Sequence, residues 1–465
     1  MKAVFQALAA NAKLHPNAIA INEGSRSISW SGLADAVARA ASGFATSSKV
    51  VGLRLSGIDY VIGDLAATLA GRRLVPVPAF FSDGQIAHLM QDAGADLVTS
   101  LPDGKRGHSL DYAGGATRVI YTSGTTGRPK GVVLGDRQIA ASLAALSHAL
   151  QPGPDDRYLS VLPQAQLLEQ VCGMFMPILA GAPVVISREA AASLFTGDGR
   201  ALARIAEETH PTVTVLAPRQ LALWAAELRR GAPTPASLRY VAVGGAPVAP
   251  ALLSEARAFG LPVAEGYGLS EACSVVAMTP TTASDGSAMT VLDGVEVSIE
   301  DGEIVIAGPT VMEGYLHGAC QQGPWHTGDL GRLQDGRLEV LGRRDAMILR
   351  QSGRNIAPEW VEAEALADPA FPVAALVQSP EDELILVAAA ISSPDMAGLI
   401  QRLSALPSYA RPDQLVIVDP RAPGLIRPSG TADRRVAAEL ARSATTGCMT
   451  LRYPEQQSQP DEATS

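Results

Sequence analysis

The chain has 465 residues, of which 47% are hydrophobic and 18% charged, and its net charge at neutral pH is −10. This length exceeds what one hydrophobic core usually supports, so we expect two or more domains. The acidic balance argues against a general nucleic-acid binder, because the phosphate backbone requires a basic surface. The scattered cysteines form no CxxC pair, which argues against a zinc or disulfide framework and favours a reducing, cytoplasmic location.

The N-terminal segment has no long apolar core, so we expect no signal peptide, and no uninterrupted apolar run predicts a membrane span. Helical and strand-like patterns then alternate along the first two thirds of the chain, which predicts an α/β fold with a largely parallel sheet. The predicted helices are 5–14, 30–45, 61–71, 137–150 and 167–181, and the predicted strands are 50–56, 73–80, 116–122, 156–163, 182–187, 211–218 and 238–245.

The pattern changes near residue 285. Residues 295–311 and 336–350 alternate apolar and polar positions around Asp-Gly turns, which predicts half-exposed antiparallel strands. The last part of the chain combines helical and strand patterns and is typical of a small α+β domain. The polar tail is predicted to be disordered.

One glycine-rich segment, YTSGTTGRPKG at 121–131, follows a predicted strand and precedes residues 132–143, which are expected to turn helical. Glycine lets the backbone approach an anion, so successive N–H groups and hydroxyls can hold phosphate oxygens, with Lys130 as a point charge. A plain surface loop is the alternative. The segment matches neither the P-loop spacing nor the Rossmann fingerprint. The candidate ligands are Thr122, Ser123, Gly124, Thr125, Thr126, Gly127 and Lys130.

Residues 122–131 resemble the phosphate loop of the adenylate-forming family, which includes acyl- and aryl-CoA ligases, peptide-synthetase adenylation domains and luciferases. The resemblance implies a large N-terminal domain, residues 1–343, built from two αβ lobes and a distorted β-barrel portion. It also implies a small mobile α+β lid at 344–445, followed by the tail at 446–465.

Further segments resemble family motifs in the family's order. Residues 239–248, with Gly245 and Ala246, are similar to the turn beside the adenine and acyl pockets. Residues 265–272 contain Tyr267, expected to stack on adenine, together with Gly268 and with Ser270, whose hydroxyl replaces the family's usual threonine. In the same segment Glu271 is expected to bind Mg²⁺, together with Thr126.

The resemblance implies nucleotide-binding and hinge roles for residues in two more segments. Asp329, within 325–331, is expected to accept hydrogen bonds from the ribose hydroxyls. Residues 342–362 resemble the segment joining the two domains, with Arg343 contacting ribose or phosphate and Asp345 at the hinge. Each residue has a structural alternative, such as capping a turn.

The sequence departs from the family pattern at two positions. Gln166 stands where the family usually has a histidine beside the substrate carboxylate. Thr431 occupies the position of the lid lysine that bridges the carboxylate and the α-phosphate, and the chain contains no lysine after Lys130. Arg427 or Arg434 is a candidate replacement, although arginine has a different shape.

The resemblance implies ATP- and Mg²⁺-dependent activation of a carboxylic acid, expected to be fatty or otherwise hydrophobic, followed by transfer to the thiol of CoA or of a carrier protein's phosphopantetheine. The candidate catalytic residues are Lys130, Gln166, Glu271, Arg343 and Thr431. Two alternatives stay open: an enzyme defective in adenylation that works mainly in thioester formation, and a non-catalytic acyl or nucleotide binder.

Overall fold

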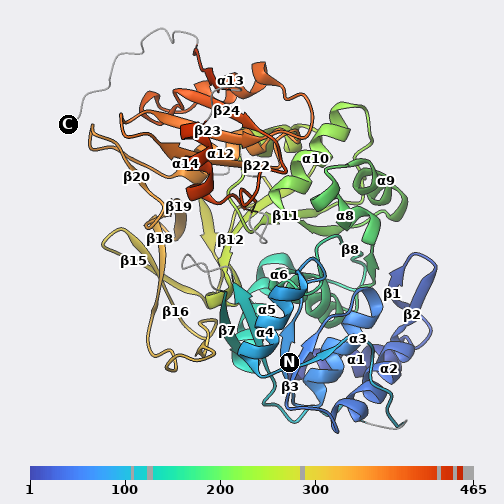
Figure 1. The fold of residues 1–465 in the computed structure, drawn as a ribbon. Coiled ribbons are helices and arrows are strands. Elements are labelled where there is room, and N and C mark those ends of the chain that lie inside the picture. Colours follow the sequence, from blue (N-terminus) through green and yellow to red (C-terminus); the bar gives the residue numbers. More distant parts are fainter. Residues whose placement is uncertain (106–108, 123–128, 283–287, 427–430, 444–447, 454–465) are drawn as a thin grey trace. The chain divides into compact units, whose positions relative to one another are not determined.

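The computed structural model describes residues 1–105, 109–122, 129–282, 288–426, 431–443 and 448–453. The chain forms two compact units (Figure 1). The larger comprises Met1–Ala246 with Leu252–Leu341, and the smaller comprises Pro247–Ala251 with Gly342–Ser465. The expected mixed α/β fold with a large N-terminal and a small C-terminal part is confirmed. The barrel portion and the mobility of the lid stay predictions.

A thirteen-stranded sheet runs through the larger unit. Its strands, in spatial order, are β15 (Glu296–Glu300), β16 (Glu303–Ala307), β18 (Trp325–Gln334), β19 (Arg337–Arg343), β14 (Met289–Val291), β13 (Ser274–Met278), β12 (Val263–Leu269), β11 (Tyr240–Gly244), β10 (Val213–Leu216), β8 (Tyr158–Ser160), β9 (Val184–Ile186), β1 (Ile19–Glu23) and β2 (Arg26–Ser29). Strands β12, β11, β10, β8, β9 and β1 are parallel, as the alternating pattern predicts, whereas the pairs from β12 to β13 and from β15 to β16 are antiparallel.

A second sheet in the same unit has six strands: β17 (Gly314–Tyr315), β7 (Lys130–Gly135), β6 (Thr117–Thr122), β4 (Arg73–Pro76), β3 (Val50–Leu53) and β5 (Asp96–Val98). Strands β3 to β6 are parallel, but β7 pairs antiparallel with β6. The expectation that residues 132–143 turn directly helical is therefore wrong for its first part. The apolar residues that follow Lys130 form a buried strand between β6 and β17 before the helix begins at Asp136.

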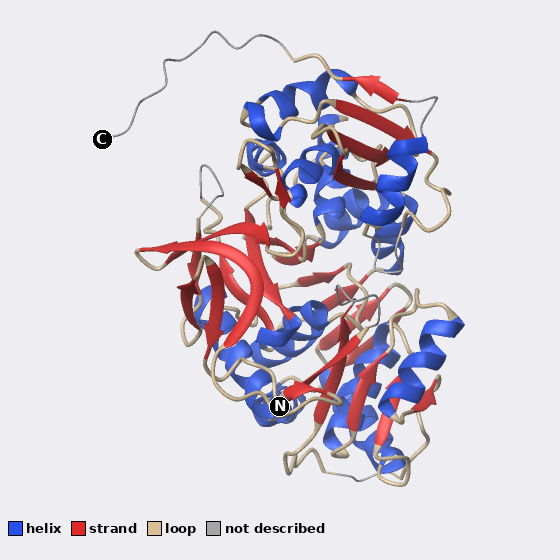
Figure 2. Ribbon diagram, turned by 60° about the vertical axis from the view of Figure 1, so that its left-hand side comes forward, coloured by secondary structure: helices blue, strands red, loops and turns tan. Residues whose placement is uncertain are grey.

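Helices pack against these sheets (Figure 2). They are α1 (Lys2–Leu14), α2 (Trp30–Phe44), α3 (Gly57–Leu69), α4 (Asp83–Ala93), α5 (Asp136–Leu150), α6 (Leu167–Glu169), α7 (Met176–Ala180), α8 (Arg188–Thr196), α9 (Arg200–Thr209), α10 (Pro218–Arg229) and α11 (Pro250–Ala258). Helix α2 shows the physical basis: Leu33, Val37 and Ala41 bury one face, and the Ser29 hydroxyl accepts a hydrogen bond from the Gly32 N–H at its start.

The predicted helix over 167–181 is continuous but irregular. Between α6 and α7 lies a π-helical segment, Gln170–Phe175, and all of its residues are buried. Such wider turns are rare and often accompany functional sites. Because the apolar spacing of this segment suits an ordinary helix, the sequence pattern gives no sign of the wider turn.

The smaller unit contains a four-stranded sheet, with α12 (Pro358–Leu366), α13 (Met396–Ser404) and α14 (Arg434–Ser443). Its strands are β22 (Val373–Gln378), β23 (Leu384–Ala389), β24 (Gln414–Val418) and β25 (Cys448–Thr450), and a separate pair comprises β20 (Ile348–Leu349) and β21 (Asn355–Ile356). Side chains on the two faces of β22 and β23 enter two different apolar clusters. Strand β25 lies within the segment expected to be a disordered tail.

No helix among the described residues is long and apolar enough to cross a membrane.

A substitution at Gly268 tests how closely the backbones of β12 and β13 approach each other. A Cβ atom there would lie 1.8 Å from the Ser274 carbonyl oxygen. We expect Gly268→Ala to lower the free energy of unfolding by about 1–3 kcal/mol, because backbone must move. Gly84→Ala is the matched control. A Cβ added at Gly84 meets nothing within 4 Å, and Gly84 lies in helix α4, where alanine is neutral or stabilising. Equal urea midpoints for the two variants would contradict this reading.

Candidate functional site

The glycine-rich segment connects two antiparallel strands. Thr122 at the end of β6 lies opposite Lys130 at the start of β7, so the ladder brings the two ends of the segment together. Its central candidate residues, Ser123, Gly124, Thr125, Thr126 and Gly127, lie outside the described residues. The Lys130 side chain is exposed at the edge of the sheet, where a cation is accessible to an anion.

Tyr315 joins Lys130 to Glu271. The Lys130 ammonium lies 5.3 Å from the centroid of the Tyr315 ring, and the Tyr315 hydroxyl donates a 2.9 Å hydrogen bond to Oε1 of Glu271. Strand β17 positions Tyr315 by pairing with β7 at Val132. No local sequence pattern marks Tyr315, because a two-residue strand has no periodicity.

Glu271 follows an unusual backbone. It lies in a short 3-10 turn, Ser270–Ala272, and the next two residues, Cys273 and Ser274, have φ angles of 55° and 91°. Positive φ at non-glycine residues costs free energy and is concentrated at functional sites. The backbone oxygen of Glu271 accepts a hydrogen bond from the Met312 N–H at 2.8 Å, which ties this turn to the segment that carries Tyr315.

Tyr267 and Asp329 are also brought together. The Tyr267 hydroxyl donates a 2.6 Å hydrogen bond to Oδ2 of Asp329, although β12 and β18 lie far apart in the sequence. The Asp329 N–H donates to the Thr327 hydroxyl, whose own hydrogen bond goes to the Ile304 carbonyl. The Asp329 carboxylate is therefore buried in a fixed position next to an aromatic ring.

The parallel strands end at one edge of the large sheet. After β11 comes Gly245, with a φ angle of +90°, and then Ala246. After β8 comes the segment with Gln166, and β12 leads through Gly268 to Ser270 and Glu271. Ligands of open α/β sheets bind at this edge, outside the carboxyl ends of the strands. The predicted residues of the larger unit thus gather where the topology favours a ligand.

Glu169, which sequence analysis did not select, is a fully buried carboxyl group close to Gln166 in sequence. It accepts hydrogen bonds from the Tyr158 hydroxyl, at 2.9 Å, and from the Ser160 hydroxyl. Burial raises the pKa of Glu169 to about 7, and the two hydroxyl hydrogen bonds only partly offset this effect. The group therefore titrates near neutral pH.

The predicted residues of the smaller unit lie in polar surroundings. Arg343 donates to Asp345, with a distance of 3.1 Å from Nε to Oδ1. Thr431 is exposed and lies three residues before helix α14. Arg434, one candidate replacement for the lid lysine, forms salt bridges with Glu359 at 3.0 Å and Glu362 at 2.9 Å. Arg434 therefore has two carboxylate partners inside its own unit, and Arg427 lies outside the described residues.

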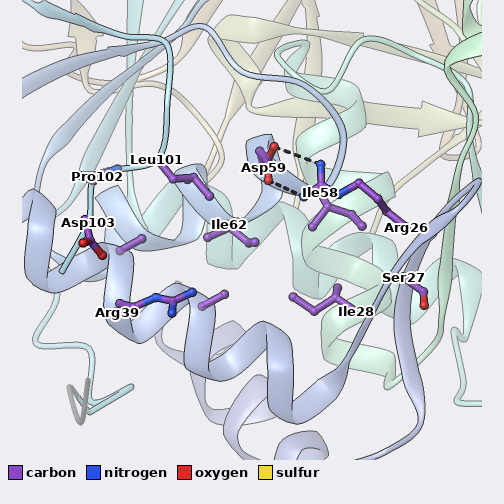
Figure 3. A pocket seen from close by; sticks show the side chains of 12 residues that line it. Arg26, Ser27, Ile28, Arg39, Ile58, Asp59, Ile62, Leu101, Pro102 and Asp103 are labelled. Atoms are coloured by element: carbon purple, nitrogen blue, oxygen red, sulfur yellow. Dashed lines mark hydrogen bonds and ion pairs between the residues drawn. The ribbon is translucent and has the colours of Figure 1, made fainter. Parts of the chain in front are cut away.

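One cavity of about 520 Å³ lies away from these residues. Strand β2, helices α2 and α3 and residues 101–103 surround it, and Arg26 pairs with Asp59 at its wall (Figure 3). None of the predicted site residues lines it, so it is separate from the candidate site.

The comparisons with known proteins confirm the resemblance expected from the motifs. Residues 116–316 match the family model described as AMP-binding enzyme. A 2-succinylbenzoate--CoA ligase from Bacillus velezensis is 36% identical over 54% of this chain and 53% of its own length. A feruloyl-CoA synthase from Amycolatopsis is 27% identical over 80% of this chain and 84% of its own length.

The matches to the 2-succinylbenzoate--CoA ligases span about half the length of those relatives. Among solved structures, the O-succinylbenzoate Coenzyme A Synthetase (MenE) from Bacillus subtilis in complex with AMP has a TM-score of 0.77 and is 25% identical, covering 92% of this chain and 97% of that one.

The titration of Glu169 gives a test by pH. The ordinary pKa of this carboxyl group is 4.5, and its pKa in the folded protein is about 7. Between these two values the unfolded chain has released the proton that the folded protein keeps. The free energy of unfolding therefore falls as the pH rises through this range. Glu169→Gln has no ionisable group at this position, so it does not lose this stability as the pH rises. We expect its free energy of unfolding, relative to the parent protein, to increase by up to about 3 kcal/mol from pH 5 to pH 8 in urea titrations.

The exposed Glu208→Gln variant serves as the control and should show a difference that does not depend on pH. A Glu169→Gln difference that stays constant across this range would mean that the buried carboxyl group is already ionised at pH 5.

Proposed function

We propose that this chain, which belongs to the AMP-binding enzyme family within the adenylate-forming superfamily, activates a carboxylic acid with ATP and transfers the acyl group to CoA. One observation carries the proposal. Residues far apart in sequence, which the family resemblance assigns to one nucleotide site, meet in this fold: Lys130 with Glu271 through Tyr315, and Tyr267 with Asp329.

The chemistry has two steps. A substrate carboxylate oxygen attacks the α-phosphorus of ATP, the bond to pyrophosphate breaks, and an acyl-adenylate forms. The CoA sulfur then bonds to the acyl carbon, the bond to AMP breaks, and the thiol proton leaves to solvent or base. The protein's task is mainly alignment and charge stabilisation at phosphorus. We assign phosphate neutralisation to Lys130 and the ribose hydroxyls to Asp329.

The acidic side chain at 271 fits the Mg²⁺ that ATP chemistry uses. Its Oε1 accepts the Tyr315 hydrogen bond, and its Oε2 makes no hydrogen bond with a described residue. Protein sites for Mg²⁺ typically supply one or two carboxylate oxygens beside substrate phosphates. Bound there, the ion would neutralise phosphate charge, and Tyr315 would hold the Glu271 carboxylate in a fixed orientation.

The acid is proposed to be aromatic. The sequence alone favoured a fatty or other hydrophobic acid, but the relatives are named for 2-succinylbenzoate and ferulate, and nothing supports the fatty or the carrier-protein part of that expectation. CoA is therefore the proposed acceptor. The two open alternatives, an adenylation-defective enzyme and a non-catalytic binder, are not favoured by relatives named as ligases and synthases.

Arg219 is a candidate ligand for a second carboxylate of the substrate. It lies three residues after β10, at the same sheet edge as Gln166 and Gly245. Its Nε is buried and has no hydrogen-bond partner among the described residues, and burial lowers the pKa of its guanidinium. A buried charged donor without a partner is costly, so we infer that Arg219 binds a carboxylate of the substrate other than the reacting one.

A panel of acids tests both the proposed aromatic substrate and the proposed role of Arg219. We expect acid-dependent pyrophosphate release to be fastest with 2-succinylbenzoate, slower with ferulate and 4-coumarate, and slowest with decanoate. Arg219→Met should lower kcat/KM for 2-succinylbenzoate by about 10- to 100-fold, and for ferulate much less, because it removes a charge-assisted hydrogen bond. Arg229→Met, at the exposed end of the same helix, is the control.

The outcomes separate the two claims. No release with any acid, despite ATP binding, would overturn the proposed function. Equal losses with the dicarboxylate and with ferulate would overturn only the role of Arg219.

Thr431 sets the rate of the first step in this proposal. The hydroxyl of Thr431 cannot supply the charge of the family's lid lysine, and Arg434 is neutralised by Glu359 and Glu362. A charge-assisted contact to a developing negative centre is commonly worth a few kcal/mol. We therefore expect adenylation to proceed, but more slowly than thioester formation from preformed adenylate.

Thr431→Lys is the direct test. The position is exposed, so a lysine fits without repacking. We expect the single-turnover rate of adenylate formation to rise by at least about 10-fold, with a smaller effect on thioester formation. Thr431→Met is the uncharged control. An unchanged rate in Thr431→Lys would show that another group has taken over the role.

A further inference from the structure

A buried ion pair lies behind the candidate site. Arg118 on β6 and Asp64 on α3 are 3% and 0% exposed, and their side chains meet at 3.1 Å between Nη1 and Oδ2. The Arg118 guanidinium also lies 4.9 Å from the centroid of the Phe175 ring, in the π-helical segment. Strand β6 leads directly into the glycine-rich segment, so this pair anchors the strand that carries it.

Gln170 connects this ion pair to the segment that carries Gln166. Its side-chain oxygen accepts a hydrogen bond from Nη1 of Arg118, and its side-chain nitrogen donates to the Ala165 carbonyl at 3.0 Å and to the Tyr60 hydroxyl at 3.2 Å. Its backbone N–H donates to the Gln166 carbonyl at 3.0 Å. Gln170 is fully buried, so each of these contacts is protected from water.

The backbone of Gln166 is consequently fixed from both sides. The carbonyl before it and its own carbonyl both bond to Gln170, and its N–H donates to the Pro163 carbonyl at 2.9 Å. By contrast, the Gln166 side chain is half-buried and makes no hydrogen bond with another described residue, so its amide is available to a ligand.

We propose that Gln170, itself held by Arg118, is a positioning residue that sets the place of Gln166 relative to strand β6. The inference rests on the proposed function, in which Gln166 borders the acid and β6 leads to the phosphate loop. Through this link the two substrate-binding segments share one buried polar anchor. Gln170 is the first residue of the π-helical segment, and its side chain is buried.

Gln170→Leu removes the side-chain bonds to Arg118, Ala165 and Tyr60 while keeping the Arg118–Asp64 pair. Removing Arg118 instead would leave a buried carboxylate without its partner and endanger folding. Gln170→Glu is the second variant, since it keeps an acceptor for Arg118 but loses the donor to Ala165. Gln138→Leu is the matched control: Gln138 is also a buried glutamine in this unit, and it donates to the Val311 carbonyl at 2.9 Å.

Two measurements are made on the full chain. Hydrogen–deuterium exchange of peptides covering residues 162–170 should become about 10-fold faster in both Gln170 variants and stay unchanged in Gln138→Leu. In pyrophosphate-release assays, the KM for the acid should rise about 10-fold in both Gln170 variants, while the KM for ATP changes by less than about 2-fold.

Unchanged exchange in residues 162–170 would overturn the proposal, whether or not the protein shows activity. An equal rise of both KM values would assign Gln170 a general structural role and overturn the positioning role. If the parent protein releases no pyrophosphate with any acid, the proposed function fails, and the exchange measurement still decides whether Gln170 positions this segment.

Discussion

The common direction of β8, β10, β11 and β12 places the candidate residues that follow them at one edge of the large sheet. Because these neighbouring strands are parallel, their carboxyl ends lie at one edge, and each strand delivers a different segment to it: residues with Gln166, Arg219, Gly245 and Glu271. No single segment contains a complete site. The candidate residues come from several loops that one sheet holds together, although they lie far apart in the sequence.

Buried polar groups then fix these loops in place. Tyr315 orients Glu271, Gln170 orients the backbone at Gln166, and the Arg118–Asp64 pair anchors β6. A buried ion pair adds little net stability, because desolvation offsets much of the attraction. An arrangement of α3 and β6 that separated Arg118 from Asp64 would leave a buried charge without its partner, which is strongly destabilising.

The sequence predicted most of the regular helices and strands, but it did not predict the features that depend on contacts between distant segments. Apolar periodicity located most of the parallel strands and long helices, and the Asp301–Gly302 turn marked the hairpin of β15 and β16. It did not predict β7, because the apolar run at 132–134 is too short to show a strand period and lies directly before the helical pattern of α5. Nor did it predict the π-helical turn, Tyr315, Glu169 or Gln170. These features depend on contacts between distant segments, and no local pattern encodes them.

The site residues divide in the same way. Motif order proposed Tyr267, Glu271 and Asp329 as candidates, and the structure adds that Tyr267 contacts Asp329 and that Tyr315 contacts Glu271. The expected role of Arg434 as a replacement cation could not be judged from spacing, since Glu359 and Glu362 lie 75 and 72 residues before it. Only the fold shows that its charge is already committed.

The exposed hydroxyl at position 431 has a chemical consequence beyond rate. An acyl-adenylate is a reactive mixed anhydride, and a lysine ε-amino group is the protein nucleophile best suited to intercept it as a stable amide. The chain has no lysine after Lys130, so neither Thr431 nor any other side chain of the smaller unit presents such an amine. In the proposed reaction, that unit is therefore protected from permanent self-acylation by its own intermediate, whatever acid the enzyme activates.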